Sequence, residues 1–209
     1  MSYAQQVVES ASQDRLYKLI EERLRPGADQ AAIDRRIWDL FGEDWAVMFT
    51  DLSGFSRKVE EFGIIHFLQV IHESERLFIP LIDRHDGILI KVEGDSLLVL
   101  FRSTQSALEC AIDMQRAAQD YNKDRSDAEK ILLCVGLGFG KLLKLGDRDV
   151  FGAEVNAASK LGEDTAKAWE ILVTGAAQKS AAGMPGVSFT PIAEIPSGAK
   201  AAFRVQYTL

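Results

Sequence analysis

Two aspartates stand at the ends of apolar segments, where their carboxylates could hold a metal ion. Asp51 follows the run WAVMFT, and Asp95 lies between two further apolar runs in KVEGDSLLVLF. Two converging carboxylates repel each other, and either a cation or a raised pKa in one of them relieves the repulsion. A site with few protein oxygen ligands suits Mg²⁺ or Mn²⁺, with phosphate and water completing the coordination. The chemistry that these residues favour is therefore two-metal chemistry on phosphate.

The loop after Asp51 has the composition of a phosphate-binding turn. It reads LSGFS, and a helix is predicted to begin near Ser56. Gly54 lets the backbone approach a ligand closely, and backbone N–H groups at a helix N-terminus attract phosphate. The alternative is that Asp51 and Ser56 are ordinary turn and N-cap residues. The residues alone leave both interpretations open.

The surrounding apolar segments predict the elements that position these residues. A strand over 45–50 leads into the loop, and a long amphipathic helix follows over 63–85. Two apolar runs over 87–101 meet at Glu93-Gly94 and predict a hairpin. A second helix follows over 103–125, with Ser103 as its N-cap. The apolar faces are expected at positions 65, 68, 71, 77 and 78 of the first helix and at 107, 108, 111, 114 and 117 of the second.

Shorter segments complete the predicted sheet. ILLCVGLGFG predicts a strand, and KLLKLG is expected to pair with it as a hairpin arm. DVFGAEVNAASKLGED is expected to begin as a loop and become a helix. EILVTG predicts another strand, and two last strands pair around PSGAK. The order β, α, β, β, α, β predicts an α+β fold, a ferredoxin-like antiparallel sheet with helices on one face. Such a sheet places the hairpin turn beside the end of the first strand.

Residues 1–43 are predicted to form a helical appendage to a domain over 44–209. Tyr17, Leu19-Ile20 and Leu24 recur at helical spacing, and Pro26-Gly27 ends that helix. A second amphipathic stretch, AAIDRRIWDLFG, stops at Gly42. These helices are expected to dock on the domain or on a partner. Their charges are mixed in sign, so a membrane-surface helix is the less favoured alternative.

Composition and motifs argue against several other classes of protein. The net charge of −7, without a basic block, disfavours binding to nucleic acid or an anionic membrane. No apolar run reaches the ~20 residues of a membrane span. The polar N-terminus lacks a signal-peptide core, so a cytoplasmic location is expected. Cys110 and Cys134 lie in apolar patterns and are expected to be reduced core thiols.

Two further features, the glycines of GLGFG and the three histidines, are interpreted as structural. GLGFG matches only half of a dinucleotide fingerprint, and no strand–turn–helix context follows it. His66, His72 and His85 are spaced by 6 and 13 residues, which does not suit a metal pair, so they are expected at the surface or its boundary. No GxSxG or Walker A motif is present.

The stretches FTDLSGFS, KVEGDSLLVLF and DVFGAEVNAASKL resemble the class III nucleotide cyclase catalytic domain, the family of the adenylyl and guanylyl cyclases. The resemblance runs from about Trp45 to Thr174, and it rests on the order and spacing of the motifs. The matching polar residues are Asp51, Lys91, Asp95, Asp149, Asn156 and Lys160.

The resemblance implies a role for each motif residue. Asp51 and Asp95, with the carbonyl of Leu52, would hold two ions of Mg²⁺ or Mn²⁺ per site. Amides of Gly54, Phe55 and Ser56 would bind the phosphates. Lys91 and Asp149 would bind the base, and this pair favours adenine because guanylyl cyclases typically place Glu and Cys there. Asn156 would orient the ribose.

Lys160 is the chief departure from the family pattern, because it stands where the family has an arginine that stabilises charge on the α-phosphate. A lysine keeps the charge and loses the bidentate fork, which could lower the rate on the order of 10²–10³-fold. A further phosphate-binding lysine of the family has Lys200, in PSGAK, as its nearest candidate.

The resemblance also implies a homodimer with composite active sites. The leading hypothesis is an adenylate cyclase that converts ATP to 3′,5′-cyclic AMP and pyrophosphate. The alternative is a degenerate cyclase-like domain that binds nucleotide and signals by dimerisation without useful turnover. A purely structural ferredoxin-like domain is a third possibility, because this fold hosts many unrelated functions.

Overall fold

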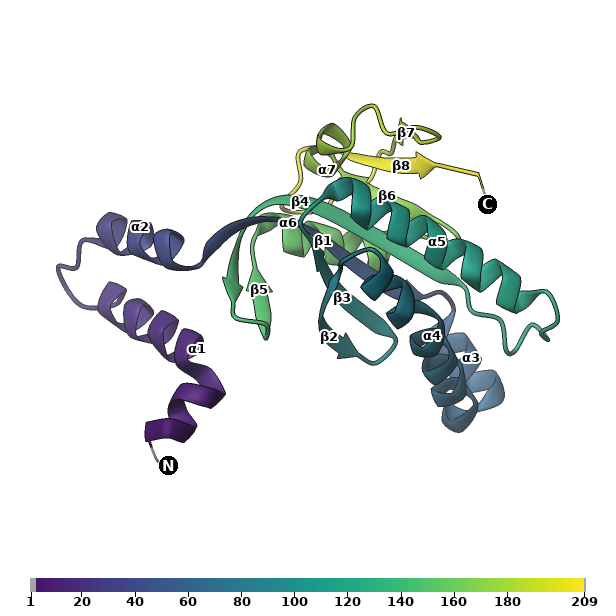
Figure 1. The fold of residues 1–209 in the computed structure, drawn as a ribbon, viewed down its shortest axis with the longest axis horizontal. Coiled ribbons are helices and arrows are strands. Elements are labelled where there is room, and N and C mark those ends of the chain that lie inside the picture. Colours follow the sequence, from purple (N-terminus) through teal and green to yellow (C-terminus); the bar gives the residue numbers. More distant parts are fainter. Residues whose placement is uncertain (1–2, 209) are drawn as a thin grey trace.

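A computed structural model describes the backbone of residues 3–208 and, apart from residues 3–10 and 55–58, their side chains. Within residues 3–208, one eight-stranded sheet carries helices on both faces (Figure 1). The strands are β1 (Gly42–Leu52), β2 (Ile88–Glu93), β3 (Ser96–Phe101), β4 (Leu133–Leu145), β5 (Asp149–Phe151), β6 (Ile171–Thr174), β7 (Ser188–Pro191) and β8 (Ala202–Gln206). The helices are α1 (Tyr3–Arg23), α2 (Gln30–Phe41), α3 (Phe55–Phe62), α4 (Ile64–Arg84), α5 (Thr104–Asn122), α6 (Ala153–Ser159), the π-helical turn η1 (Lys160–Thr165) and α7 (Gly175–Ser180).

The strand order confirms the α+β fold with a mainly antiparallel sheet. The order is β2-β3-β1-β4-β6-β8-β7, with β5 paired to the end of β4. β1 lies between β3 and β4 and runs antiparallel to both, and only β4 and β6 pair in parallel. Because β1 and β3 are neighbours, the end of β1 lies beside the turn of the β2–β3 hairpin.

The strand β1 separates two hydrophobic layers, because successive side chains of a strand point to opposite faces. Met48 packs with α4 and α5 in the larger core, whereas Val47 packs with α6 in a second cluster. α5 lies in front of the sheet and α6 behind it in Figure 1. The two long predicted helices therefore share one face, and α6 occupies the other.

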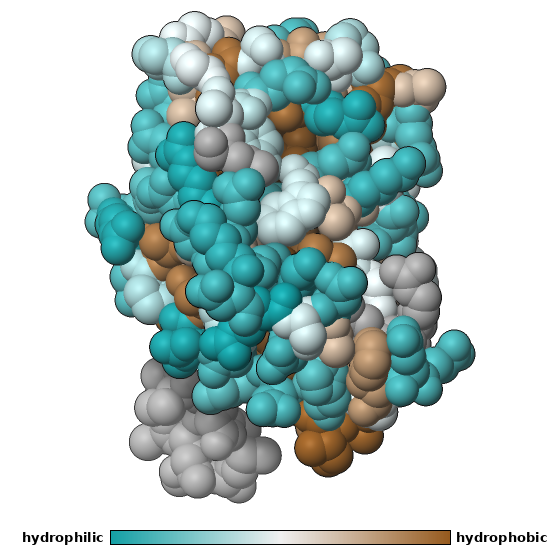
Figure 2. Space-filling view, turned by 90° about the vertical axis from the view of Figure 1, so that its right-hand side faces the viewer, coloured by the Kyte–Doolittle hydropathy of each residue, from teal (hydrophilic) through white to brown (hydrophobic). Residues whose placement is uncertain are grey.

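The helix α4 is present as predicted, and its expected apolar face is right at Phe78, Ile71 and Leu77, which are buried or pack against the core, and wrong at its first two positions. Its buried residues include Phe67, Val70 and Phe78, whereas Ile65 is 75% exposed and Leu68 51% exposed. The start of α4 and the end of α3 project beyond the sheet (Figure 1). Apolar atoms gather at this lower end of the molecule in Figure 2. The first turns of α4 therefore have no sheet to cover, and the predicted positions there stay exposed.

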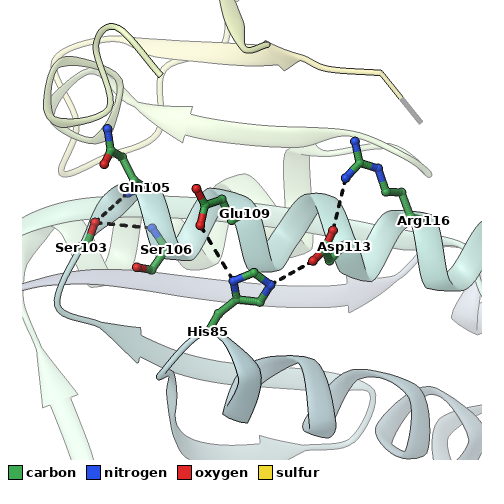
Figure 3. A network of polar contacts seen from close by, with 7 residues as sticks. All are labelled: His85, Ser103, Gln105, Ser106, Glu109, Asp113 and Arg116. Carbon is green, nitrogen blue, oxygen red and sulfur yellow. Dashed lines mark hydrogen bonds and ion pairs between the residues drawn. The ribbon is translucent and has the colours of Figure 1, made fainter. Parts of the chain in front are cut away.

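A polar network joins the end of α4 to α5 (Figure 3). The His85 ring nitrogen Nε2 lies 3.0 Å from Asp113 Oδ2, and Nδ1 lies 4.0 Å from Glu109 Oε2. Arg116 donates to Asp113 and to the carbonyl of Thr208. Ser103 accepts hydrogen bonds from the amides of Gln105 and Ser106, which confirms its predicted N-cap role. His85 is half-buried, as expected for a residue at the surface boundary.

The segment after GLGFG does not turn back as predicted. KLLKLG continues β4, which pairs with β1 from Leu52↔Leu133 to Gly42↔Leu143. The strand that forms a hairpin with the end of β4 is β5, whose residues were expected to form a loop. The glycines of β4 misled the prediction, because a helix packs on them and they do not form a turn.

The N-terminal helices extend to one side of the sheet (Figure 1). Ion pairs between Arg23 and Asp34 and between Arg36 and Glu22 join α1 to α2. The predicted face of α1 is wrong in part. Leu19 is buried as expected and Leu16 with it, whereas Tyr17, Ile20 and Leu24 are exposed. The buried cluster consists of Leu16, Leu19, Ile33, Ile37, Phe41 and Leu145.

Candidate active site

The structure brings the two predicted metal ligands together. Asp51 lies near the end of β1, and the pair Thr50↔Leu97 places the start of β3 alongside it. Asp95 occupies the turn before β3, next to Gly94, whose φ of 61° is a left-handed conformation that glycine adopts readily. The neighbouring strands β1 and β3 thus deliver both carboxyl groups to one point.

The surroundings of Asp51 and Asp95 oppose the ionisation of both carboxyl groups. Burial, and next the charge of Asp95, raise the pKa of Asp51 to about 7. Burial also raises the pKa of Asp95. The N–H of Leu52 hydrogen-bonds to both carboxylates, which favours their charged forms and opposes the shift. Without a cation, burial and mutual repulsion therefore oppose ionisation of both carboxyl groups.

One oxygen of the pair has an unused capacity to accept a ligand. Asp95 Oδ2 is buried and has no hydrogen-bond partner within the described part of the chain. Such an orphaned anionic oxygen is costly unless a cation or a donor satisfies it. Among the described residues, no group of three or more His, Cys, Asp or Glu could hold a metal ion. The donor set thus fits hard cations that complete their coordination with substrate oxygens and water.

The loop between β1 and α3 leads into the N-terminus of a helix, as predicted. Gly54 is the N-cap of α3 with a φ of 88°, and no side chain caps the helix. The N–H of Ser53 donates to the carbonyl of Leu132 at 2.8 Å, which anchors the loop to the start of β4. The helix begins at Phe55, one residue before the predicted start, so the N-cap alternative for Ser56 is wrong. The side chains of Phe55 and Ser56 lie outside the described residues.

The predicted base-binding residues form an ion pair, although they are 58 residues apart in the chain. Lys91 Nζ lies 2.8 Å from Asp149 Oδ2 and 3.7 Å from Glu93 Oε1. The hydrogen bond to Asp149 is the main cause of the raised pKa of Lys91. The pair lines a cavity of about 120 Å³ with apolar walls from Phe49, Leu98, Val150 and Val155. This cavity offers one cationic donor and carboxylate acceptors to a flat, mostly apolar group.

Asn156 and Lys160 lie four residues apart on and just after α6, so they occupy one face of the helix. Both are exposed, whereas Val155, just before Asn156, and Ala157 and Ala158, between the two, are buried against the sheet. In the part of the chain that the structure describes, no hydrogen bond or ion pair joins Asn156 or Lys160 to the aspartate pair. Both groups are therefore accessible at the surface of the chain.

Glycines in β4 explain how α6 reaches this position. A Cβ at Gly136 would lie 2.1 Å from the carbonyl oxygen of Ala158, and one at Gly138 would lie 2.5 Å from that of Glu154. Real Cβ atoms do not approach so closely, so only glycine allows the helix to lie directly on the strand backbone. The glycines of GLGFG thus form the surface on which α6 packs. This structural role agrees with the expectation that GLGFG is not a dinucleotide-binding motif.

Two carboxylates near the site were missed from the sequence. Glu93 approaches Lys91, and Glu163 lines the same cavity and contributes to the raised pKa of Asp51. Glu163 reaches this position through the π-helical turn η1, where Gly162 packs on the backbone of Phe49 and Gly136. Glu93 is the last residue of β2, directly before the turn that carries Asp95. This position beside a predicted metal ligand was the signal for Glu93 in the sequence. No sequence pattern signalled the π-turn.

The fold and the site together define a class of protein, an α+β domain with paired carboxylates beside a glycine-capped helix N-terminus. The chain belongs to the adenylate and guanylate cyclase catalytic domain family, whose model matches residues 42–203. An adenylate cyclase from Streptomyces coelicolor is 30% identical over 169 residues, which are 76% of this chain and 40% of that protein. The serine/threonine-protein kinase pkn2 of Myxococcus xanthus is 28% identical over 134 residues, covering 64% of this chain and 16% of the kinase.

Solved structures agree on the fold. A crystal structure of an adenylate/guanylate cyclase/hydrolase from Silicibacter pomeroyi has a TM-score of 0.69 and 24% identity, covering 78% of this chain and 96% of that one. This chain spans less than half of the length of the two sequence relatives. No helix within residues 3–208 is both long enough and apolar enough to cross a membrane.

Proposed function

We propose that this chain is an adenylate cyclase, which converts ATP to 3′,5′-cyclic AMP and pyrophosphate. The observation that carries the proposal is the convergence of Asp51 and Asp95, with one buried carboxylate oxygen left without a partner. Family membership gives the reaction class, and the relatives named adenylate cyclase favour ATP. The division into an appendage over 1–43 and a domain over 44–209 is part of the same proposal.

Asp51 and Asp95, with the Leu52 carbonyl, would hold two ions of Mg²⁺ or Mn²⁺. Bound there, the ions would lower the pKa of the ribose 3′-hydroxyl and neutralise charge on the triphosphate. The chain's own contribution begins with ionisation of the aspartate pair, which the raised pKa of Asp51 opposes near neutral pH. The left-handed Gly54 and the amides of Phe55 and Ser56 would then bind phosphate oxygens at the start of α3.

The Lys91–Asp149 pair would select adenine. The ammonium of Lys91 donates to a ring nitrogen with a lone pair, and the carboxylate of Asp149 accepts from an exocyclic amine. The N1 edge of adenine presents this acceptor and donor side by side, whereas the same edge of guanine presents the opposite pattern. The ion pair in the free protein keeps both groups in place before the base arrives.

A homodimer would complete the site. Asn156 and Lys160 are exposed and, among the described residues, form no hydrogen bond or ion pair with the aspartate pair of their own chain, so a partner subunit would supply them to it. Asn156 would orient the ribose, and Lys160 would stabilise charge on the α-phosphate as the transition state forms. The turn that precedes Lys200 packs on α6, since a Cβ at Gly198 would lie 2.3 Å from the carbonyl oxygen of Ala153. Lys200 thus follows a turn that contacts the start of α6, and we propose it as a second phosphate-binding cation.

A degenerate domain that binds nucleotide without useful turnover is the second candidate, and Lys160 is the observation that favours it. Lysine cannot reproduce the two parallel hydrogen bonds of an arginine to phosphate. Metal and nucleotide binding would survive this change, because the aspartate pair and the base cavity do not depend on Lys160.

Mixing two inactive variants tests the composite site. Asp95→Asn removes a metal ligand and Asn156→Ala removes the ribose contact, so each homodimer should be inactive. A heterodimer carries one site in which both residues are intact. We expect a 1:1 mixture to recover about a quarter of wild-type activity, since half of the dimers are mixed and each has one good site. Mixed dimers with no recovered activity, beside an active wild type, would contradict the composite arrangement.

A further inference from the structure

Glu154 lies in the first turn of α6, two residues before Asn156, and its side chain reaches into the sheet. Its Oε2 accepts a hydrogen bond from the backbone N–H of Phe139 at 3.1 Å and another from the Thr174 hydroxyl at 2.6 Å. Phe139 belongs to β4, and Thr174 is the last residue of β6. One carboxylate oxygen thus joins the helix to two neighbouring strands.

The contact occupies the place where the β4–β6 ladder ends. The parallel pairing runs from Val135↔Ile171 to Leu137↔Val173 and stops there. The amide of Val135 donates toward the β6 side, to the carbonyl of Glu170. The amide of Phe139 lies four residues further along the same edge of β4, beyond the end of β6. Glu154 therefore supplies the acceptor that β6 no longer provides, and a buried N–H requires such a partner.

Apolar packing of Val155 and Ala158 holds α6 against the sheet, and the glycines of β4 let the helix lie close to the strand backbone. A Cβ at Gly138 would lie 2.5 Å from the Glu154 carbonyl oxygen, and one at Gly140 would lie 3.3 Å from Glu154 Cγ. Glycine allows this close approach, and the apolar contacts of α6 fill space without a directional restraint on the rotation of the helix or on its position along its axis. The two directional bonds of Glu154 supply that restraint.

We infer that Glu154 is a positioning residue for turnover: it fixes α6 on the sheet so that Asn156 and Lys160 face the nucleotide held by the partner subunit. The inference rests on the proposed function. Asn156 and Lys160 are exposed, so their orientation depends on the helix that carries them. A displacement of about 1 Å in positioned groups can cost on the order of 10²-fold in rate. The aspartate pair, Lys91 and Asp149 lie outside α6, and α6 contributes only the apolar side chain of Val155 to the wall of the base cavity.

Three variants of the full chain test the inference by steady-state kinetics. Glu154→Ala removes both bonds, Glu154→Asp keeps the charge but shortens the reach, and Glu154→Gln keeps an acceptor oxygen of the same length. We expect kcat to fall on the order of 10²-fold in the Ala and Asp variants, with KM for ATP within about threefold of wild type. The Gln variant should stay within about threefold in both. Glu194→Ala, in an exposed loop, is the control.

Hydrogen exchange supplies a readout that does not need turnover. The amide of Phe139 should exchange faster in the Ala and Asp variants and keep its protection in the Gln variant. A purely structural role predicts lower melting temperatures with unchanged kcat per folded molecule, and that result overturns the inference. If the Ala variant does not fold, the Asp and Gln variants decide the question. If the wild type and the Asp variant are equally active, the role of Glu154 is refuted and the proposed function stands. If the wild type itself is inactive, the proposed function is refuted.

Discussion

Asp51→Asn should make the metal-free protein more stable while it abolishes metal binding. In the wild type, the folded state opposes ionisation of Asp51, because burial and Asp95 raise its pKa to about 7 from 3.8. Asparagine has nearly the same shape, can still accept the Leu52 N–H, and carries no charge. The variant removes the repulsion and keeps the packing, a trade between stability and function that is common at active sites.

The size of the effect follows from the pKa. A pKa of about 7 in place of 3.8 corresponds to at most about 4 kcal/mol against ionisation in the folded state. The carboxyl is partly exposed, and solvent screening reduces this to about 1–2 kcal/mol. For a domain of this size, that gain raises the melting temperature by about 2–8 °C.

The effect has a defined pH dependence. The pKa of Asp51 in the folded state lies above its value in the unfolded state. Protonation of Asp51 therefore stabilises the folded wild type fully below about pH 4, and this stabilisation is lost as the pH rises through about 7. Asp51→Asn does not titrate, so the difference between the two proteins should be small at pH 4 and largest at pH 8.

Thermal melts with and without Mn²⁺, from pH 4 to pH 8, measure both effects. In EDTA at pH 8 the variant should melt above the wild type, and Mn²⁺ should stabilise only the wild type, since only that protein binds it tightly. Asp39→Asn, at an exposed position on α2, is the matched control and should change neither result. A variant that melts lower at pH 8 in EDTA, or that gains as much as the wild type from Mn²⁺, would refute the reasoning.

Three further predictions follow from the site. Lys160→Arg should raise kcat on the order of 10²–10³-fold by restoring the bidentate contact, and an unchanged kcat in a steady-state assay argues against that role. Lys91→Glu combined with Asp149→Cys should shift the preference from ATP toward GTP, measured as the ratio of kcat/KM values. Gly136→Ala should destabilise the fold by about 1–3 kcal/mol in urea melts, because its Cβ would meet the Ala158 carbonyl at 2.1 Å. A fully stable Gly136→Ala protein would show that α6 does not depend on that glycine.

The parts that the sequence predicted well depend on local chemistry. Glycine and acidic residues between two apolar runs specify the β2–β3 turn, and Ser103 specifies the start of α5. Chain order then places Asp95 beside Asp51, because sequential strands of this fold pair in a fixed order. The Lys91–Asp149 contact could be expected only through the resemblance to a family, since 58 residues and several elements separate the two.

The parts that were missed depend on packing between distant segments. The face of α4 was wrong at Ile65 and Leu68 because the first turns extend past the sheet, and periodicity does not report where a sheet ends. The glycines of β4 suggested a break, whereas they admit α6, a contact set by residues about 20 positions further along the chain. The bonds of Glu154 depend on where β6 stops, which no local pattern contains.

A product assay tests the central claim most directly. The purified protein, under conditions in which it is dimeric, is incubated with ATP or GTP in the presence of Mg²⁺ or Mn²⁺, and cyclic nucleotide and pyrophosphate are measured. The account predicts cyclic AMP and an equal amount of pyrophosphate from ATP, no product in EDTA, and less product from GTP. A dimeric protein that binds Mn²⁺ and ATP but forms no cyclic AMP would contradict it.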